Sequence, residues 1–400
     1  MSPDTRLLLL LAAATGIAPF MLHAIAPGLP EVAESFGVSS AVAQLLLSLG
    51  LAAMAVATVF LGTLSDAVGR RPVLLVSMGV AAIGSAVVAV APTIEVAIAG
   101  RVAQAAAAAG GITIARAVAA DLYDRDRATA FIAKLTAVMV LMPMIAPAAG
   151  GELVVAFGWR SVFIVGTLLT IATWLGLWLG VRETLEVPSG RVDLAHLFSG
   201  LAYAAESRIF WGCTLFSALQ MAAFFSFVGA APFVMREAYG FGPEIYGRYF
   251  VFISAIFMAS NYAASLLSAQ LGTAAILRLG AFIAVVGVGA MLFALASGME
   301  GPVWLFIPAG VNAVAAGLSL PSAVSLAVLD RAKRAGAASS FVGFAQFLLA
   351  GIATQVGGAL PHTSPLPVIA LLWALSTLGV LICGVLAPGV FRRNRALSEP

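Results

Sequence analysis

Long apolar stretches dominate this sequence, and they decide what a chain of this kind can fold into. A membrane-spanning helix needs about twenty mostly apolar residues. Twelve stretches of about that length occur, at residues 7–28, 41–64, 73–91, 96–120, 131–151, 161–181, 209–234, 247–268, 279–297, 303–328, 337–359 and 367–388. The sequence therefore predicts an all-α polytopic membrane protein with twelve transmembrane helices.

The composition supports this class and excludes others. Of the 400 residues, 62% are hydrophobic and only 10% charged, whereas charged residues make up about a quarter of a soluble domain. The two cysteines, Cys213 and Cys383, lie in apolar stretches, so neither a disulfide framework nor a metal site is indicated. The formal charge of +3 is spread over many short loops and does not indicate nucleic-acid binding. Arg6 and the apolar residues after it resemble a signal peptide, but the uncharged stretch continues to Pro30, so we expect an uncleaved first helix.

The basic residues predict the orientation. An even number of spans places both termini on one side, and short cytoplasmic loops are rich in Lys and Arg. Sixteen basic residues lie on the same side of the membrane as the two termini, and three lie on the opposite side. Both termini are therefore expected to be cytoplasmic. The longest loop, 182–208, contains Pro188 and Gly190 and divides the chain into six-helix halves at 1–181 and 209–400.

A weak internal repeat agrees with this division. The string Leu64-Ser-Asp-Ala-Val-Gly69 recurs as Leu267-Ser-Ala-Gln-Leu-Gly272, at an offset of 203 residues. Arg127 before the fifth span matches Arg334 before the eleventh. Similar offsets with the same orientation predict parallel repeats, as in transporters built from two halves.

The loop between the second and third spans is the most distinctive string. It reads Gly62-Thr-Leu-Ser-Asp66-Ala-Val-Gly69-Arg70-Arg71-Pro72. So short a connection forces its two helices to pack closely where they leave the lipid. Any tight cytoplasmic turn would explain the two arginines alone, whereas an aspartate at the helix end between glycines favours a dedicated role.

Three ionisable side chains fall at lipid depth: Arg101 and Arg116 in the fourth span, and His23 in the first. A charge near the bilayer centre costs about 2.5–3.5 kcal/mol or more, so such residues face a bundle interior or water. We expect Arg101 to face a central cavity or to be paired structurally, and Arg116 to serve a cavity or to extend to the cytoplasmic surface. His23 is either a hydrogen-bonded packing residue or a proton carrier, because histidine can change charge near neutral pH.

Other spans contain small and polar residues, and each of these groups can be explained either by helix packing or by a functional role. The cluster of Pro143, Pro147, Gly150 and Gly151 in the fifth span predicts a packing hinge rather than ordinary membrane Gly and Pro. Four amides in later spans are either substrate contacts or hydrogen bonds between helices: Gln220, Asn261, Asn312 and Gln346.

The sequence offers no sign of catalysis or nucleotide use. It lacks a Gly-x4-Gly-Lys-Ser/Thr string, a soluble region large enough for an ATPase, and any evident nucleophile–base pair or metal cluster. We therefore expect no enzyme activity, no cofactor and no ATP-driven transport by this chain alone.

Taken together, these strings resemble the major facilitator superfamily, and within it the Bcr/CflA-type drug-resistance transporters, over almost the whole chain. The superfamily strings are Gly62-x-Leu-Ser-Asp66-x-x-Gly69-Arg70-Arg71, Arg101-Val-Ala-Gln104 and Ala146-Pro147-Ala-Ala-Gly150-Gly151. The strings closer to the subfamily are Arg116-Ala-Val-Ala-Ala-Asp121-Leu-Tyr123, Gly158-Trp159-Arg160, Arg334-Ala-Gly336-x-Ala-Ser339 and the Pro-Gly-Leu-Pro30 end of the first span.

The resemblance implies a twelve-helix alternating-access transporter that exports drug-like molecules in exchange for protons. It implies that Asp66 faces the amides near 337–340 when the inner side is closed, that Arg70 pairs with Asp121, and that Arg101 takes part in coupling. A carboxylate is favourable at a helix N-terminus, which agrees with the first of these. One departure is His23, where relatives typically carry an aspartate. Protonation makes histidine positive but aspartate neutral, so the charge balance of the cavity differs.

We therefore expect a proton-coupled exporter of small amphipathic compounds such as antibiotics, a monomer in a bacterial inner membrane, with a small-molecule substrate, protons and the lipid bilayer as its partners. Two alternatives stay open. One is an uncoupled or differently coupled carrier of an anionic metabolite, which the buried cation Arg101 and a protonated His23 would suit. The other is a non-transporting membrane sensor.

Overall fold

The computed structural model describes residues 3–188, 190, 199, 202–203, 206–331 and 334–391. This part of the chain contains helices and no β-strand, and twelve helical segments are long and apolar enough to cross a membrane. The prediction of twelve spans is therefore confirmed. The structure extends most of them beyond the apolar stretches, because a helix continues into the interface wherever its backbone hydrogen bonds can continue.

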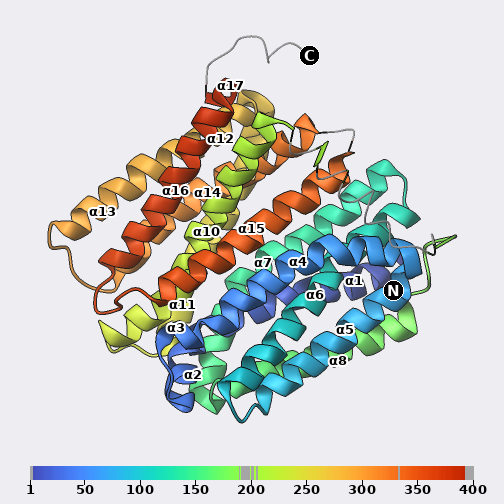
Figure 1. Ribbon diagram of the computed structural model, residues 1–400, viewed down its shortest axis with the longest axis horizontal. Coiled ribbons are helices and arrows are strands. Elements are labelled where there is room, and N and C mark those ends of the chain that lie inside the picture. The colour runs from blue at the N-terminus through green and yellow to red at the C-terminus, as the bar shows by residue number, and fades with distance from the viewer. Residues whose placement is uncertain are drawn as a thin grey trace. The chain divides into compact units, whose positions relative to one another are not determined.

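The chain forms two compact units, Met1–Ala195 with Gly242–Arg248, and His196–Phe241 with Tyr249–Pro400. The helices of unit 1, blue to green in Figure 1, are α1 (Pro3–Ala24), η1 (Ala26–Gly28), α2 (Leu29–Phe36), α3 (Ser40–Ala43), α4 (Leu45–Val68), α5 (Arg70–Ala89), α6 (Ile94–Leu122), α7 (Arg125–Phe157) and α8 (Arg160–Gly180). Unit 2 contains α10 (Arg208–Glu237), most of α11 (Pro243–Leu271), α12 (Thr273–Phe282), the π-helix η2 (Ile283–Gly287), α13 (Val288–Ala296), α14 (Val303–Asp330), α15 (Ala335–Gly358), α16 (Leu366–Leu386) and α17 (Pro388–Phe391). The domain boundaries expected from the sequence stay a prediction, since much of the loop 182–208 lies outside the described residues.

The first span is not one continuous helix. It was expected at 7–28, but α1 ends at Ala24, and a 3-10 turn containing Pro27 leads into α2, which runs on to Phe36. Proline lacks an N–H, so Pro27 and Pro30 stand where the chain can forgo regular α-helical hydrogen bonds, at the start of a short helix.

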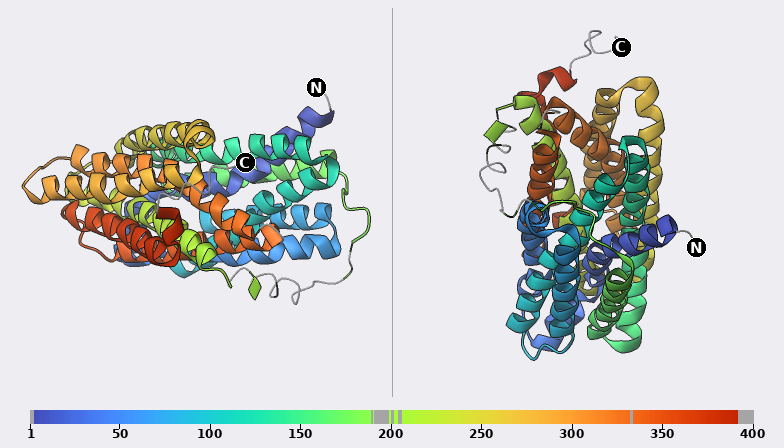
Figure 2. Two further views of the ribbon diagram at one scale, coloured as in Figure 1. Left: turned by 90° about the horizontal axis from the view of Figure 1, so that it is seen from above. Right: turned by 90° about the vertical axis from the view of Figure 1, so that its right-hand side faces the viewer.

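The two units repeat the same helix neighbours. In unit 1, α1 packs against α6, α7 and α8; in unit 2, α10 packs against α14, α15 and α16. Likewise α5 packs on α6, and α12 on α14. The three views show these helices side by side within each unit (Figures 1 and 2). Since the pairs match in chain order, the two units repeat one arrangement of helices, as the offset strings predicted.

The repeated string ends at the same kind of helix connection in both units. Gly69 is the single residue between α4 and α5, and Gly272 is the single residue between α11 and α12. Both have positive φ, 114° and 82° respectively. This backbone region favours glycine because a Cβ would clash with the backbone. The recurring string therefore corresponds to a one-residue connection between helices, which only glycine can form without strain.

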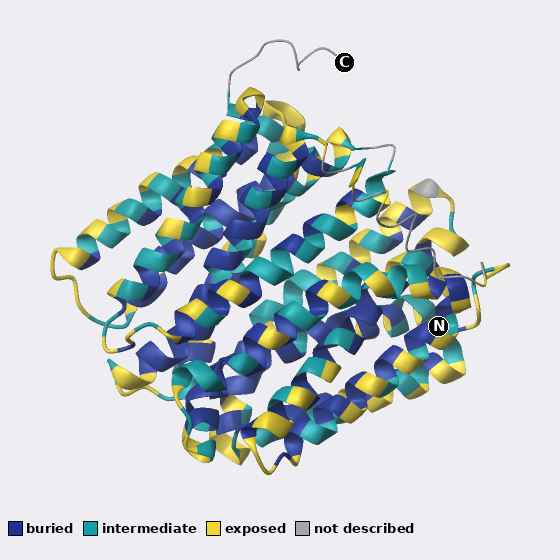
Figure 3. Cartoon of the chain, viewed as in Figure 1, coloured by how far each residue is buried: buried dark blue, intermediate teal, exposed yellow. Residues whose placement is uncertain are grey.

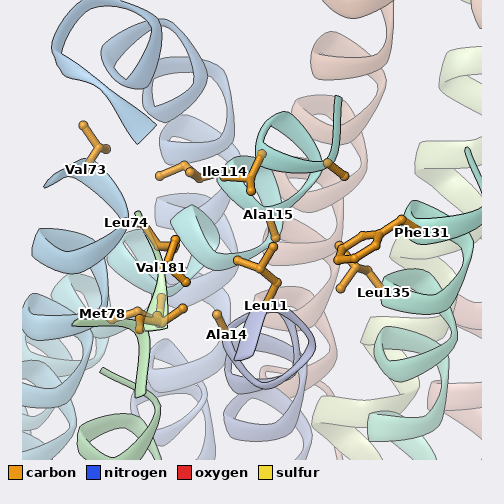
Figure 4. Close-up of a cluster of buried hydrophobic side chains, with 13 residues drawn as sticks. Leu11, Ala14, Val73, Leu74, Met78, Ile114, Ala115, Phe131, Leu135 and Val181 are labelled. Carbon is orange, nitrogen blue, oxygen red and sulfur yellow. The ribbon is translucent and has the colours of Figure 1, made fainter. Parts of the chain in front are cut away.

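Apolar side chains divide between cores and outward faces. One buried cluster in unit 1 joins α1, α5, α6 and α7 and includes Leu11, Met78 and Phe131 (Figure 4). In unit 2, α10 is buried along most of its length (Figure 3). By contrast, Val76 and Ile83 on α5 are exposed, about two turns apart on one face. Exposed apolar residues along one face of a helix are what contact with lipid requires.

Close helix contacts rest on glycine. A Cβ on Gly111 of α6 would overlap the carbonyl oxygen of Ala14 on α1. A Cβ on Gly84 of α5 would lie 2.7 Å from both the amide nitrogen of Gln104 and the carbonyl oxygen of Gly100 on α6. Lipid supplies no hydrophobic drive between apolar helices, so van der Waals packing through small residues has to hold them.

The loop after α15 is anchored by His362. Its buried imidazole stacks on Phe233, with ring centroids 5.1 Å apart, and Nε2 lies 3.3 Å from the carbonyl oxygen of Gly357. Nδ1 lies 3.7 Å from Oε1 of Glu237, at the end of α10. Burial lowers the pKa of His362 below 6.5, although the Glu237 carboxylate and the Gly357 carbonyl oppose the shift.

We expect Gly111→Ala to lower the free energy of unfolding by about 1–3 kcal/mol, the usual cost of overpacking. Thermal unfolding of the purified protein in detergent measures this. Gly384→Ala on α16 is the matched control, because no atom lies within 4 Å of the position that its Cβ would take, and alanine is the better helix former. Equal stability of the two variants would contradict the close α1–α6 contact.

We expect acid to destabilise the protein through His362. Its folded-state pKa is lowered, so its contribution to stability is complete above pH 6.5 and is lost as the pH falls below 6.5, where the unfolded chain takes up the proton first. The unfolding temperature of wild type should fall from pH 7.5 to pH 5 more steeply than that of His362→Gln. Identical slopes would contradict this assignment.

Candidate functional site

Arg70 is the centre of an ionic cluster at one end of unit 1. Its Nε lies 2.9 Å from Oδ2 of Asp121 in the last turn of α6. Its Nη1 donates to Oγ of Ser65 at 2.7 Å and lies 2.5 Å from Oδ1 of Asp66, both on α4. The Arg70–Asp121 ion pair that the resemblance implied is therefore present. Since Arg70 is 8% exposed, the pair is largely shielded from water, where charge-assisted hydrogen bonds are strongest.

Arg71 and Glu183 each cap a helix end: Glu183 caps the start of α5, and Arg71 caps the end of α8. The Glu183 carboxylate accepts hydrogen bonds from the backbone N–H groups of Arg70 and Arg71, at 2.9 and 3.1 Å. The Arg71 side chain in turn donates to the carbonyl oxygens of Val181 and Trp178, at 2.8 and 2.9 Å. A helix leaves N–H groups unpaired at its start and carbonyls unpaired at its end. Each of these charged side chains satisfies the end whose partial charge is opposite to its own.

Glu183 was not singled out from the sequence. Burial raises the pKa of its carboxyl, but the hydrogen bonds from the N–H groups of Leu185, Arg70, Arg71 and Thr184 outweigh burial and hold the pKa below its usual value. The signal available was a glutamate just after the sixth apolar stretch, which has no meaning until α5 and α8 are seen side by side.

Two features of this site require glycine at position 69. Besides its positive φ, a Cβ at this position would lie 2.6 Å from Oε2 of Glu183. By contrast, a Cβ on Gly62 would make only an ordinary contact, 3.6 Å from Thr113. The expected contact of Asp66 with residues 337–340 joins the two units and stays a prediction.

Arg101 lies in the core of unit 1, only 2% exposed. Its Nε donates to the carbonyl oxygen of Leu46 on α4 at 3.2 Å, and Nη2 to that of Met21 on α1 at 3.3 Å. Nη1 donates to Oε1 of Gln104, one turn on along α6. Among the described residues no carboxylate lies within 4.0 Å of the guanidinium. Neutral oxygens accept its hydrogen bonds, and its Cζ lies 6.0 Å from the centroid of the Phe163 ring.

His23 lies on α1, two residues after the carbonyl that Arg101 binds, and is 4% exposed. Its Nδ1 is 2.8 Å from the carbonyl oxygen of Pro19. A carbonyl only accepts, so Nδ1 carries the hydrogen and Nε2 the lone pair in the neutral ring. The guanidinium of Arg101 therefore lies against the same turn of α1 that carries His23. The structure therefore brings together the two groups that the sequence nominated for coupling.

The helix-five string packs α7 against two partners. A Cβ on Gly150 would overlap the carbonyl oxygen of Ala24 at the end of α1. A Cβ on Gly151 would lie 2.6 Å from the carbonyl oxygen of Pro243, in the first turn of α11, which groups with unit 1. Pro143 and Pro147 lie inside α7. Close packing is thus observed, and the role of a hinge stays a prediction.

The amides nominated for a substrate cavity are dispersed. Gln220 on α10 and Asn312 on α14 are buried together, with Nε2 of Gln220 donating to Oδ1 of Asn312 at 3.3 Å. Ser376 on α16 donates to the same oxygen at 3.2 Å. In this structure the pair is a hydrogen-bonded link between helices, and a role for it in substrate contact stays a prediction.

The other nominated cavity residues do not join that pair. Asn261 lines a pocket of about 480 Å³ with residues of α14, including Pro321 and Val324, and Gln346 is half-buried on α15. Arg116 is exposed on α6 of unit 1, with Nη2 3.7 Å from Sδ of Met139. A cavity shared by all five residues stays a prediction.

Comparison with known proteins decides the family. The family model described as Major Facilitator Superfamily matches residues 11–354. The chain belongs to this superfamily. It is a transporter rather than an enzyme, and a multi-pass membrane protein that takes a small-molecule substrate.

Curated relatives align along nearly the whole length. An uncharacterized MFS-type transporter, YdgK of Bacillus subtilis, is 25% identical over 372 residues, covering 91% of both chains. Multidrug resistance protein MdtL of Klebsiella pneumoniae is 26% identical over 386 residues, covering 96% of both. MdtL of Salmonella typhi is 27% identical over 381 residues, covering 93% of this chain and 91% of the relative.

Solved structures share the fold. An inward-facing, unoccupied bacterial homologue of the human lysosomal transporter Spinster superposes with a TM-score of 0.74 at 16% identity, covering 98% of this chain and 97% of the other. A D-xylose–proton symporter superposes with a TM-score of 0.73 at 14% identity, covering 97% of this chain and 99% of the other. At these identities the likeness concerns the fold alone.

We expect Glu183→Ala to destabilise the protein by about 1 kcal/mol, the typical loss when a helix N-cap acceptor is removed. Thermal unfolding in detergent measures the change. Glu186→Ala is the control, because Glu186 is three residues further on and takes no part in these caps. If both variants unfold at the same temperature, the cap on α5 contributes nothing to stability.

Proposed function

We propose that this transporter exports small amphipathic compounds, antibiotics among them, in exchange for protons. The observation that carries the proposal is that the buried guanidinium of Arg101 donates to the carbonyl oxygen of Met21, two residues before the buried His23 on α1. The curated relatives of the chain include multidrug resistance proteins. The excess of basic residues on one side supports cytoplasmic termini, and the bacterial relatives support an inner membrane.

Arg101 sets the electrostatics of the proposed site. It holds a fixed positive charge at membrane depth, with carbonyl and amide oxygens as its partners. When Nε2 of His23 takes up a proton, a second positive charge forms beside the first. Like charges in a poorly screened interior repel strongly. The protonated state is therefore less favourable, and it releases its proton readily once access changes sides.

The same electrostatics links the proton to the substrate. A cationic substrate bound near these groups disfavours protonation of His23, and by reciprocity a proton on His23 weakens binding of the cation. Such competition is the condition for exchange, because one binding site serves one of the two at a time. Export of cationic amphiphiles against protons follows from it.

The Arg70 cluster is the proposed inner gate. Asp66 is more than half exposed, so its carboxylate is available to the N–H groups at the start of α15 near 337–340. Ser65, Asp121 and the Arg71–Glu183 caps hold the backbone around Gly69 in place. We propose that this cluster moves as one piece when the gate opens.

A second candidate is a carrier of an anionic metabolite. Arg101 supports it, since this buried guanidinium has no carboxylate partner among the described residues. An anion would bind there together with a proton on His23, because each stabilises the other. Proton and substrate would then move in the same direction, which distinguishes this candidate from the exporter.

The test uses inverted membrane vesicles with an inside-acid pH gradient. Accumulation of cationic, neutral and anionic compounds is followed for wild type, His23→Gln and His23→Asp, with His362→Gln as the control. We expect gradient-driven accumulation of cationic or neutral amphiphiles to be lost in His23→Gln, retained in His23→Asp and unchanged in the control. Gradient-free exchange should persist in every variant.

Three outcomes would contradict the proposal. Accumulation that ignores both the gradient and His23 favours an uncoupled carrier. Proton-linked movement of anions alone, lost in Arg101→Gln, favours the second candidate. Ligand binding without movement in purified liposomes favours the membrane sensor.

A further inference from the structure

A second feature of unit 1 lies apart from His23 and Arg101. A pocket of about 340 Å³ opens between the first turns of α1 and α7 and the end of α6. It is lined by Asp4, Thr5, Leu8, Tyr123, Arg127, Ala130, Phe131 and Lys134. The pocket and the Arg70 cluster are both formed by helix ends on the same side of unit 1. The pocket therefore lies at the proposed cytoplasmic surface.

The rim of the pocket is cationic. Arg127 and Lys134 are seven residues apart on α7, on one face and about 10 Å apart along the axis. Asp4 is the one acid in the lining, and the hydroxyl of Tyr123 donates to its Oδ1 at 3.1 Å. Two positive charges against one hydrogen-bonded carboxylate leave a net attraction for an anion.

The floor of the pocket is apolar. Phe131 is 8% exposed and belongs to the same buried cluster as Leu11 and Leu135 (Figure 4). Leu8 and Ala130 extend this apolar surface toward the rim. Tyrosine beside an apolar surface is typical of the membrane–water interface. A site with cations above and hydrocarbon below suits a molecule that has an anionic head and an apolar body.

We propose that this pocket binds the phosphate headgroup of an anionic phospholipid from the adjacent leaflet. Basic pockets between transmembrane helices on the cytoplasmic side bind such headgroups. Arg127 presents a planar fork of donors to the phosphate oxygens, and Lys134 adds a point charge. Leu8, Ala130 and Phe131 contact the glycerol and the first methylenes of the acyl chains. A free phosphate ion would leave this apolar floor unused.

The test measures stabilisation of the full-length protein in mixed micelles. Dioleoyl phosphatidylglycerol is titrated into delipidated protein and the unfolding temperature is recorded, with dioleoyl phosphatidylcholine as the neutral lipid. The pocket variant is Arg127→Gln/Lys134→Gln. The matched control is Arg182→Gln/Arg208→Gln, which removes two exposed charges from the same proposed membrane face outside the pocket.

We expect the half-saturating phosphatidylglycerol concentration to rise about tenfold or more in the pocket variant, since each basic residue near the surface contributes appreciably to anionic-lipid binding. The control should shift by much less, and phosphatidylcholine should not distinguish the proteins. If the pocket variant does not fold, Lys134→Gln alone should give a rise of about threefold.

Equal shifts in the pocket and control variants would overturn the proposal, because they would show attraction to surface charge in general. Stabilisation of wild type by inorganic phosphate or glycerol phosphate, at the level of the lipid, would assign the pocket to a soluble anion instead. Neither result depends on transport, so the lipid site and the proposed exporter are tested separately.

Discussion

The absence of water from the bilayer is the constraint on which the rest of this structure depends. Backbone N–H and C=O groups in lipid must pair within their own segment, which makes every span a helix. The same absence removes the hydrophobic drive between helices, so they are held by close approach of small residues. Gly84 and Gly111 allow that approach in unit 1, where a Cβ would meet the backbone of the neighbouring helix.

Charges are consequently few, and several of them gather around Gly69 with partners for each. Around Gly69, Arg71 caps the end of α8 while Glu183 caps the start of α5. Arg70 ties α4 to α6 through Asp66 and Asp121. One residue of backbone and a few side chains thus hold four helices together at one end of unit 1, where we propose the inner gate.

Arg101 differs from Arg70 because its partners are carbonyl and amide oxygens rather than carboxylates. Such partners solvate the guanidinium without neutralising it, so the core of unit 1 keeps a positive potential beside His23. That potential is the physical basis of the proposed competition between proton and substrate. The pocket at Arg127 and Lys134 has a different use of charge, because there we propose that two cations bind an anionic lipid headgroup.

The sequence by itself determined the fold class, the twelve spans and the internal repeat, because apolar length and recurring strings do not depend on which helices meet. It also matched Gly69 with Gly272 through the recurring string, and the structure supplied the reason, since each is a one-residue connection with positive φ. Only the tertiary structure revealed the role of Glu183, 113 residues beyond Arg70, because a cap depends on which helix ends meet. Tertiary packing likewise decided that Gln220 and Asn312 hydrogen-bond to each other. The sequence of an apolar helix does not indicate which neighbouring helix an amide side chain will face.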